Sequence, residues 1–165
     1  MSCIEGVSHG AREEPRREGD AHGTAFGVHT MAFVEWTSQM SVGIDSIDKQ
    51  HLTLVALINE LHEAMKTRQA HDVLSSTFAN LVDYTRRHFE YEEQLFKKHG
   101  YAGGREHAQR HQELTDTVVA LKEKFESGSS ALSIELLDFL YRWLVDHIQG
   151  TDKGYASYLF ERGVR

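Results

Sequence analysis

Histidines and carboxylates recur in this sequence at the spacing that places side chains on one face of a helix. His88 and Glu92 are four residues apart, and so are His107 and His111. Residues four apart on an α-helix project from the same face, one turn above the other, so each pair can reach a single point. Imidazole nitrogens and carboxylate oxygens both ligate transition metals. The two pairs therefore indicate a metal site carried by helices.

Three further residues extend this set of candidate ligands to five histidines, one glutamate and one aspartate: His51, His88, Glu92, His107, His111, His147 and Asp152. A single zinc ion takes four ligands, so seven are too many for one ion. The set suits two six-coordinate ions that share bridging carboxylates. The mixture of imidazole and carboxylate favours iron, with zinc and manganese as alternatives. With a solvent bridge, one position stays open for a small ligand.

His147 and Asp152 have a spacing that an ordinary helix does not accommodate. On a continuous α-helix, residues five apart point about 140° away from each other. Gly150 lies between them. We expect the helix to end at this glycine, so that the chain turns Asp152 back toward His147.

Four amphipathic helices would carry these residues. Apolar residues recur at alternating intervals of three and four, which predicts helices over about 48–67, 71–99, 105–128 and 131–150. Asp45 or Ser46 is the expected cap of the first helix, and a short helix is expected over about 152–161. Short links make neighbouring helices antiparallel. The sequence thus predicts an all-α, antiparallel, up-down-up-down four-helix bundle.

The candidate ligands also agree in their height along such a bundle. His51 begins the first helix, whereas His88 and Glu92 lie late in the second. The third helix begins near its histidine pair, and His147 lies near the end of the fourth. Because neighbouring helices run in opposite directions, all of these side chains are expected at the same end of the bundle.

Composition limits the classes of function. A chain of 165 residues predicts one domain, and its net charge of −7 argues against a nucleic-acid or anionic-membrane partner. The single cysteine, Cys3, excludes an internal disulfide and an iron–sulfur cluster. No apolar run is long enough for a membrane span and no targeting segment is recognisable, so we expect a cytoplasmic protein. Residues 1–30 hold five of the 13 glycines and no helical period; we expect a disordered extension there and the bundle over 31–165.

Three motifs resemble those of the hemerythrin family: HFEYEE at residues 88–93, HxxxH at 107–111 and HxxxxD at 147–152. The segments VGIDSIDKQH at 42–51 and WLVDHI at 143–148 resemble its bacterial branch. The resemblance covers about 36–158 in the family's order.

The resemblance implies reversible dioxygen binding at a non-haem di-iron centre, bridged by carboxylates and by an oxo or hydroxo group. One iron would be held by His107, His111 and His147. The other would be held by His51 and His88, and dioxygen would bind at this iron. Glu92 and Asp152 would bridge the two. The resemblance also implies an apolar ligand pocket, whose dry walls disfavour the entry of water, formed by Leu54, Phe89, Trp143, Leu144 and Ile148.

Other polar residues near the set receive weaker assignments. Glu93 is a candidate hydrogen-bond partner for a ligand. Tyr155, three residues after Asp152, could donate a hydrogen bond near the centre, although a structural role is commoner for a tyrosine at the end of a bundle. His62 lies too far along its helix to share the site, so we interpret it as structural.

Three functions are compatible with such a centre. The first is a dioxygen carrier, storage or delivery protein that is not an enzyme and that supplies an oxygen-consuming enzyme. The second is a di-iron oxidase or peroxidase, or a protein that handles nitric oxide. Ferritin-like oxidases carry several glutamates, whereas this chain has two carboxylates among seven candidate ligands, which favours the carrier. The third is an oxygen or redox sensor that acts through a separate partner.

Overall fold

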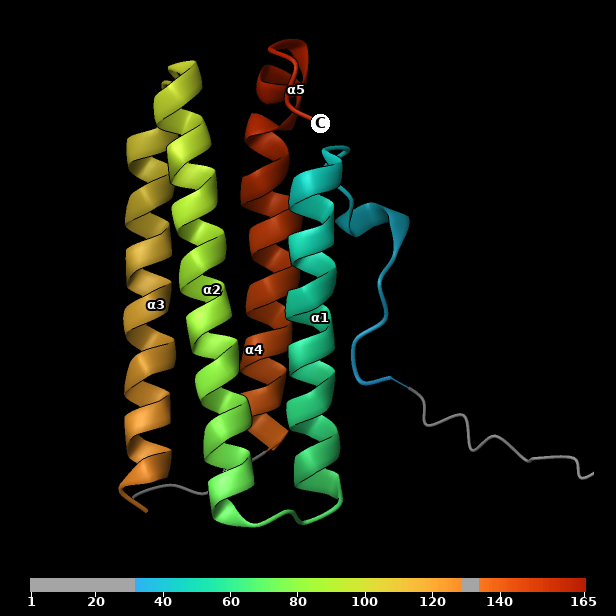
Figure 1. The fold of residues 1–165 in the computed structure, drawn as a ribbon, viewed down its shortest axis with the longest axis vertical. Coiled ribbons are helices and arrows are strands. Elements are labelled where there is room, and N and C mark those ends of the chain that lie inside the picture. Colours follow the sequence, from blue (N-terminus) through green and yellow to red (C-terminus); the bar gives the residue numbers. More distant parts are fainter. Residues whose placement is uncertain (1–31, 129–133) are drawn as a thin grey trace, which may run out of the picture. The chain divides into compact units, whose positions relative to one another are not determined.

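The structure is a computed structural model that describes residues 32–128 and 134–165. Its four long helices run alternately up and down (Figure 1): α1 (Asp45–Lys66), α2 (His71–His99), α3 (Gly104–Glu126) and α4 (Ile134–His147). No strand occurs within the described residues. The predicted all-α four-helix bundle is therefore confirmed. The extension expected at 1–30 and the link before the fourth helix lie outside the described residues.

Three short elements complete the fold. The 3-10 helix η1 (Ser38–Met40) precedes α1, and the π-helical turn η2 (Ile148–Asp152) follows α4. The last element, α5 (Lys153–Glu161), continues directly from η2 and agrees with the short helix predicted there. None of the described helices is both long and apolar enough to cross a membrane.

The start of α1 differs from the prediction. Its N-cap residue is Ile44, and no side chain caps the helix, so the expected cap by Asp45 or Ser46 is wrong. The carboxylate of Asp48 binds the preceding chain instead. It accepts the Val42 backbone N–H at 2.8 Å and the Ser41 hydroxyl at 2.6 Å. These bonds hold the incoming segment at the end of the bundle where α1 begins.

The end of α2 follows the prediction. Gly100 adopts a left-handed conformation with φ of 68°, and Tyr101 donates its backbone N–H to the carbonyl of Phe96 at 3.0 Å. Glycine suits this position because it lacks the Cβ that penalises positive φ. The hydroxyl of Tyr158 in α5 contacts the carbonyl oxygens of His99 and Gly100 at 2.8 and 2.9 Å. The C-terminal helix thus satisfies carbonyls that α2 leaves unpaired.

Apolar side chains from all four helices fill the interior. Ile58, Phe78 and Leu140 are fully buried, and Val118 and Phe125 of α3 belong to the same core. His62 lies outside the ligand cluster and stacks on Phe33 at 4.8 Å between ring centroids, in agreement with a structural role. Close packing of this core fixes the spacing of the four helices, and this spacing positions the polar residues that lie at one end of the bundle.

The helix does not end at Gly150, as the sequence predicted, but continues through the π-helical turn η2. The Lys153 backbone N–H is bonded to the carbonyl of Ile148, five residues earlier. A turn with this bonding pattern brings residues five apart to one side of the helix. Asp152 therefore faces inward with His147 although the helix is not interrupted. Arg110 of α3 ties the turn to the bundle by donating to the Thr151 hydroxyl at 3.3 Å.

Candidate metal centre

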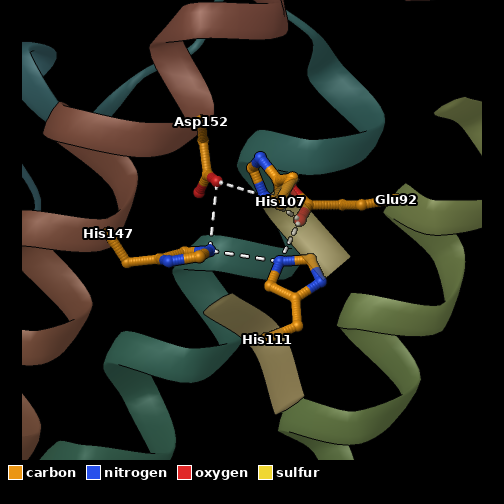
Figure 2. A group of neighbouring side chains, drawn as sticks. All are labelled: Glu92, His107, His111, His147 and Asp152. Atoms are coloured by element: carbon orange, nitrogen blue, oxygen red, sulfur yellow. Dashed lines mark hydrogen bonds and ion pairs between the residues drawn. The ribbon is translucent and has the colours of Figure 1, made fainter. Parts of the chain in front are cut away.

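All seven predicted ligands meet at one end of the bundle. His51 comes from α1, and His88 and Glu92 come from α2. The pair His107 and His111 lies near the start of α3, His147 ends α4, and Asp152 is the last residue of the π-helical turn. Figure 2 shows Glu92, His107, His111, His147 and Asp152 converging from three directions. The agreement in height that the sequence predicted is present in the structure.

The cluster is closed to solvent. Each of the seven residues exposes between 0 and 7% of its surface. Burying polar and charged groups is costly unless they are paired with one another or with a cation. A cluster of this size needs such compensation at its centre.

The seven side chains form two overlapping groups. The first contains Glu92, His107, His111, His147 and Asp152, and the second contains His51, His88, Glu92 and Asp152. Within each group, one ligand atom per residue lies within 4.8 Å of every other. Either group could hold a metal ion, and the two carboxylates belong to both.

The Nε2 atoms and carboxylate oxygens lie at the separations expected of ligands around one ion. His107 Nε2 and His147 Nε2 lie 3.2 and 3.1 Å from Asp152 Oδ1. His111 Nε2 lies 3.1 Å from Glu92 Oε2, and His51 Nε2 lies 3.3 Å from Asp152 Oδ2. Two ligands about 2.1 Å from an ion and at right angles to each other would be about 3 Å apart.

Several of these atoms have no hydrogen-bond partner within the described part of the chain. They are the Nε2 atoms of His51, His88 and His107, one oxygen of Glu92 and both oxygens of Asp152. Unsatisfied buried polar atoms are costly, and here they gather in two groups of neighbouring ligand atoms. A bound cation would satisfy them all at once, so the residues fit a metal centre with two ions.

Three residues outside the seven orient the candidate ligands. The Nδ1 of His88 lies 3.0 Å from the Gln50 carbonyl oxygen, and the Nδ1 of His111 lies 3.0 Å from a Glu93 carboxylate oxygen. A proton held on Nδ1 by such an acceptor leaves the Nε2 lone pair directed inward. Tyr155, fully buried, donates its hydroxyl to Glu92.

These three residues were predictable from the sequence to different degrees. Glu93 has the predicted contact with a ligand. The commoner structural role considered for Tyr155 is incomplete, because its hydroxyl is bonded to Glu92. Gln50 was missed. Its position directly before His51 on α1 was the one available signal, since that position can face the neighbouring helix.

Burial and pairing shift the pKa values of these groups in different directions. Burial lowers the pKa of His88 to about 4 despite the nearby Glu92 carboxylate. Burial acts the same way on His107, but the adjacent carboxylates of Asp152 and Glu92 prevail and raise its pKa to about 9. Burial favours the neutral form of both carboxyl groups, yet the facing histidines hold the pKa of Glu92 at about 2 and that of Asp152 well below its usual range. Without metal, the two carboxylates are therefore ionised and His107 carries a proton that a metal ion would displace.

The candidate centre lies within a segment of the chain that matches a known protein family. The family model described as "Hemerythrin HHE cation binding domain" matches residues 42–159. This chain belongs to the hemerythrin family. The resemblance seen in the sequence motifs is thereby confirmed, and it extends over all seven candidate ligands.

Individual relatives agree with this membership. The hemerythrin-family chain is 36% identical over 127 residues to a bacteriohemerythrin of Stenotrophomonas maltophilia (strain R551-3), covering 77% of this chain and 82% of that protein. It is 32% identical over 130 residues to a bacteriohemerythrin of Methylococcus capsulatus (strain Bath), covering 78% and 98%. A crystal structure of wild-type hemerythrin superposes with a TM-score of 0.74 at 30% identity, covering 78% of this chain and 98% of that one.

Apolar side chains surround the centre of this hemerythrin-family protein. The ring of Phe89 stacks on that of His111 at 3.7 Å between centroids and meets Trp143 edge-on at 6.1 Å. The other three residues of the predicted ligand pocket, Leu54, Leu144 and Ile148, are fully buried in the core. Trp143 is half-buried, and together with His147 it lines a groove of about 750 Å³ between α3 and α4.

Proposed function

We propose that this protein binds dioxygen reversibly at a pair of iron ions and acts as an oxygen carrier, store or delivery protein. The observation that supports the proposal is the pair of overlapping ligand groups that share Glu92 and Asp152. Sharing two carboxylates suits two neighbouring ions of the same kind. Membership of the hemerythrin family supports iron as the metal.

The proposal assigns three histidines to one ion and two to the other. His107, His111 and His147 would hold the first, and His51 and His88 would hold the second. Glu92 and Asp152 would bridge the pair. When bound, the two ions supply the electrons and the open coordination position for dioxygen.

Residues around the centre would exclude water and hold one proton in place. The fully buried Leu54, Leu144 and Ile148 would help to exclude water from the centre. Burial and the nearby Glu92 and Asp152 carboxylates raise the pKa of Tyr155 well above its usual range, so its hydroxyl keeps its proton and stays a donor to Glu92. A dry site with fixed protons favours release of an unchanged ligand over its conversion.

The ligand chemistry favours a carrier over an oxidase. Five of the seven candidate ligands are histidines, and both carboxylates lie in the overlap between the two groups. Neither carboxylate is then free to act as an acid or base on a bound ligand. The physiological recipient that we propose is an oxygen-consuming enzyme.

The test begins with metal-free full-length protein reconstituted with ferrous iron in the absence of oxygen. We expect two irons per chain by elemental analysis. Dioxygen should then produce a visible absorption band that disappears under vacuum and returns on re-exposure. Loss of the band with release of hydrogen peroxide would support the oxidase instead, and failure to take up iron would contradict the proposal altogether.

A further inference from the structure

One histidine in each half of the candidate centre contacts a side-chain oxygen through its Nδ1, and these two oxygens differ in charge. On the side of the three-histidine group, the Nδ1 of His111 contacts a Glu93 carboxylate oxygen at 3.0 Å. On the side of the two-histidine group, the Nδ1 of His88 contacts the Gln50 side-chain carbonyl at the same distance. The two contacts share one geometry, but one acceptor is charged and the other is neutral.

We propose that Glu93 and Gln50 are positioning residues that make the two metal positions unequal, with Glu93 strengthening cation binding at the three-histidine group. The inference rests on the proposed function, because it assumes that both groups bind an ion. A carboxylate that accepts the imidazole N–H increases the basicity of the opposite nitrogen, whereas an amide oxygen orients the ring without adding charge. Both rings are oriented in the same way, but the Nε2 of His111 should bind a cation more strongly than the Nε2 of His88.

The side chain of Glu93 lies between solvent and the buried ring of His111. Its side chain is 41% exposed, while the ring that it contacts is almost completely buried. It borders a groove of about 470 Å³ between α2 and α3 that also reaches His111. Water can therefore solvate the outer carboxylate oxygen while the inner one accepts the N–H. Gln50 is half-buried, where a neutral amide costs less to desolvate than a carboxylate.

The same groove supplies a matched control. Glu90 lies one helical turn before Glu93 on α2, is exposed and lines the groove, yet none of the described contacts joins it to a candidate ligand. Glu90→Gln removes the same charge from the same surface. A difference between Glu93→Gln and Glu90→Gln would then reflect the contact with His111 and not the net charge of the protein.

The experiment measures stepwise affinity for Co²⁺ alone on metal-free full-length protein, in competition with a chromophoric chelator. Unmodified protein should bind two ions with unequal dissociation constants. Glu93→Gln should weaken the tighter step by about 10- to 100-fold, the usual effect of losing such a partner, while the looser step stays in place. Glu90→Gln should change neither step by more than about twofold. Gln50→Glu should tighten the looser step.

The double variant Glu93→Gln with Gln50→Glu distinguishes an effect of the acceptor's charge from an effect of ring orientation, since both variants keep an acceptor oxygen. It should bring the two dissociation constants closer together or reverse their order. If Glu93→Gln behaves like Glu90→Gln while unmodified protein still binds two ions, the inference is wrong and the proposed function stands. If unmodified protein binds no second ion, the proposed function itself fails.

Discussion

Replacing Tyr155 by phenylalanine isolates one bond of the candidate centre. Tyr155 is fully buried, and phenylalanine keeps its ring contacts with Phe96 and His107, so the change removes the hydroxyl without opening a large cavity. What is lost is the donor to the Glu92 carboxylate. A hydrogen bond to a charged group contributes about 1.5–3 kcal/mol to stability. Because neither partner is exposed, no discount for solvent applies.

This loss of stability should be measurable as a lower melting temperature. At about 2.1 cal/mol/K per residue over the roughly 130 residues that the structure describes, 1 kcal/mol corresponds to about 4 °C. Tyr155→Phe in the metal-free protein should therefore melt about 6–11 °C lower, with a matching fall in the urea midpoint. The control is Tyr101→Phe, because the Tyr101 ring packs in the same aromatic cluster but its hydroxyl makes none of the described hydrogen bonds. Equal melting temperatures for the two variants would refute the reasoning.

Three further perturbations test the centre and its surroundings. His147→Ala should bind one iron per chain and lose dioxygen binding; two irons with a normal absorption band would contradict the ligand assignment. Leu144→Ala should speed autoxidation of the iron-loaded protein by admitting water, and it should cost about 2–5 kcal/mol of stability because the side chain is 1% exposed. Leu140→Ala, one turn earlier and equally buried, should destabilise similarly without changing autoxidation; equal autoxidation rates would show that the wall is not protective. Removing metal with a chelator should lower the free energy of unfolding by about 4 kcal/mol for each ion lost, relative to protein in Fe²⁺ at 1,000 times the dissociation constant of each site. Urea titration with and without Fe²⁺ under anaerobic conditions measures this difference, and an unchanged midpoint would indicate that no ion binds the folded state.

Local spacing was enough to predict the helices and the faces that carry the ligands. The four-residue intervals of His88 with Glu92 and of His107 with His111 define one direction on each helix, whatever the rest of the chain does. Alternation of helix direction then placed both pairs at one end. Helix boundaries were less certain, since Asp48 binds the preceding chain and α1 begins at Asp45.

The outer contacts required knowledge of neighbouring helices. Gln50 meets His88 across 38 positions in sequence, and Tyr155 meets Glu92 across 63. No periodicity within one helix specifies such pairs. Gly150 was ambiguous for a different reason, because glycine is compatible both with a helix end and with a π-helical turn. In the structure this segment forms the π-helical turn, and Arg110 of α3 donates a hydrogen bond to Thr151 within it.

Three distant contacts depend on the π-helical winding of one short segment, Ile148–Asp152. Rewinding Ile148–Asp152 into an ordinary helix of the same length would rotate everything beyond it by roughly 100°, because an α-helix turns further over five residues than a π-helix does. Asp152 would leave the cluster, Tyr155 would leave Glu92 and Tyr158 would leave the carbonyls at the end of α2. A substitution between His147 and Asp152 that favours ordinary helical winding should therefore weaken all three contacts together, even where the exchanged side chain takes part in none of them.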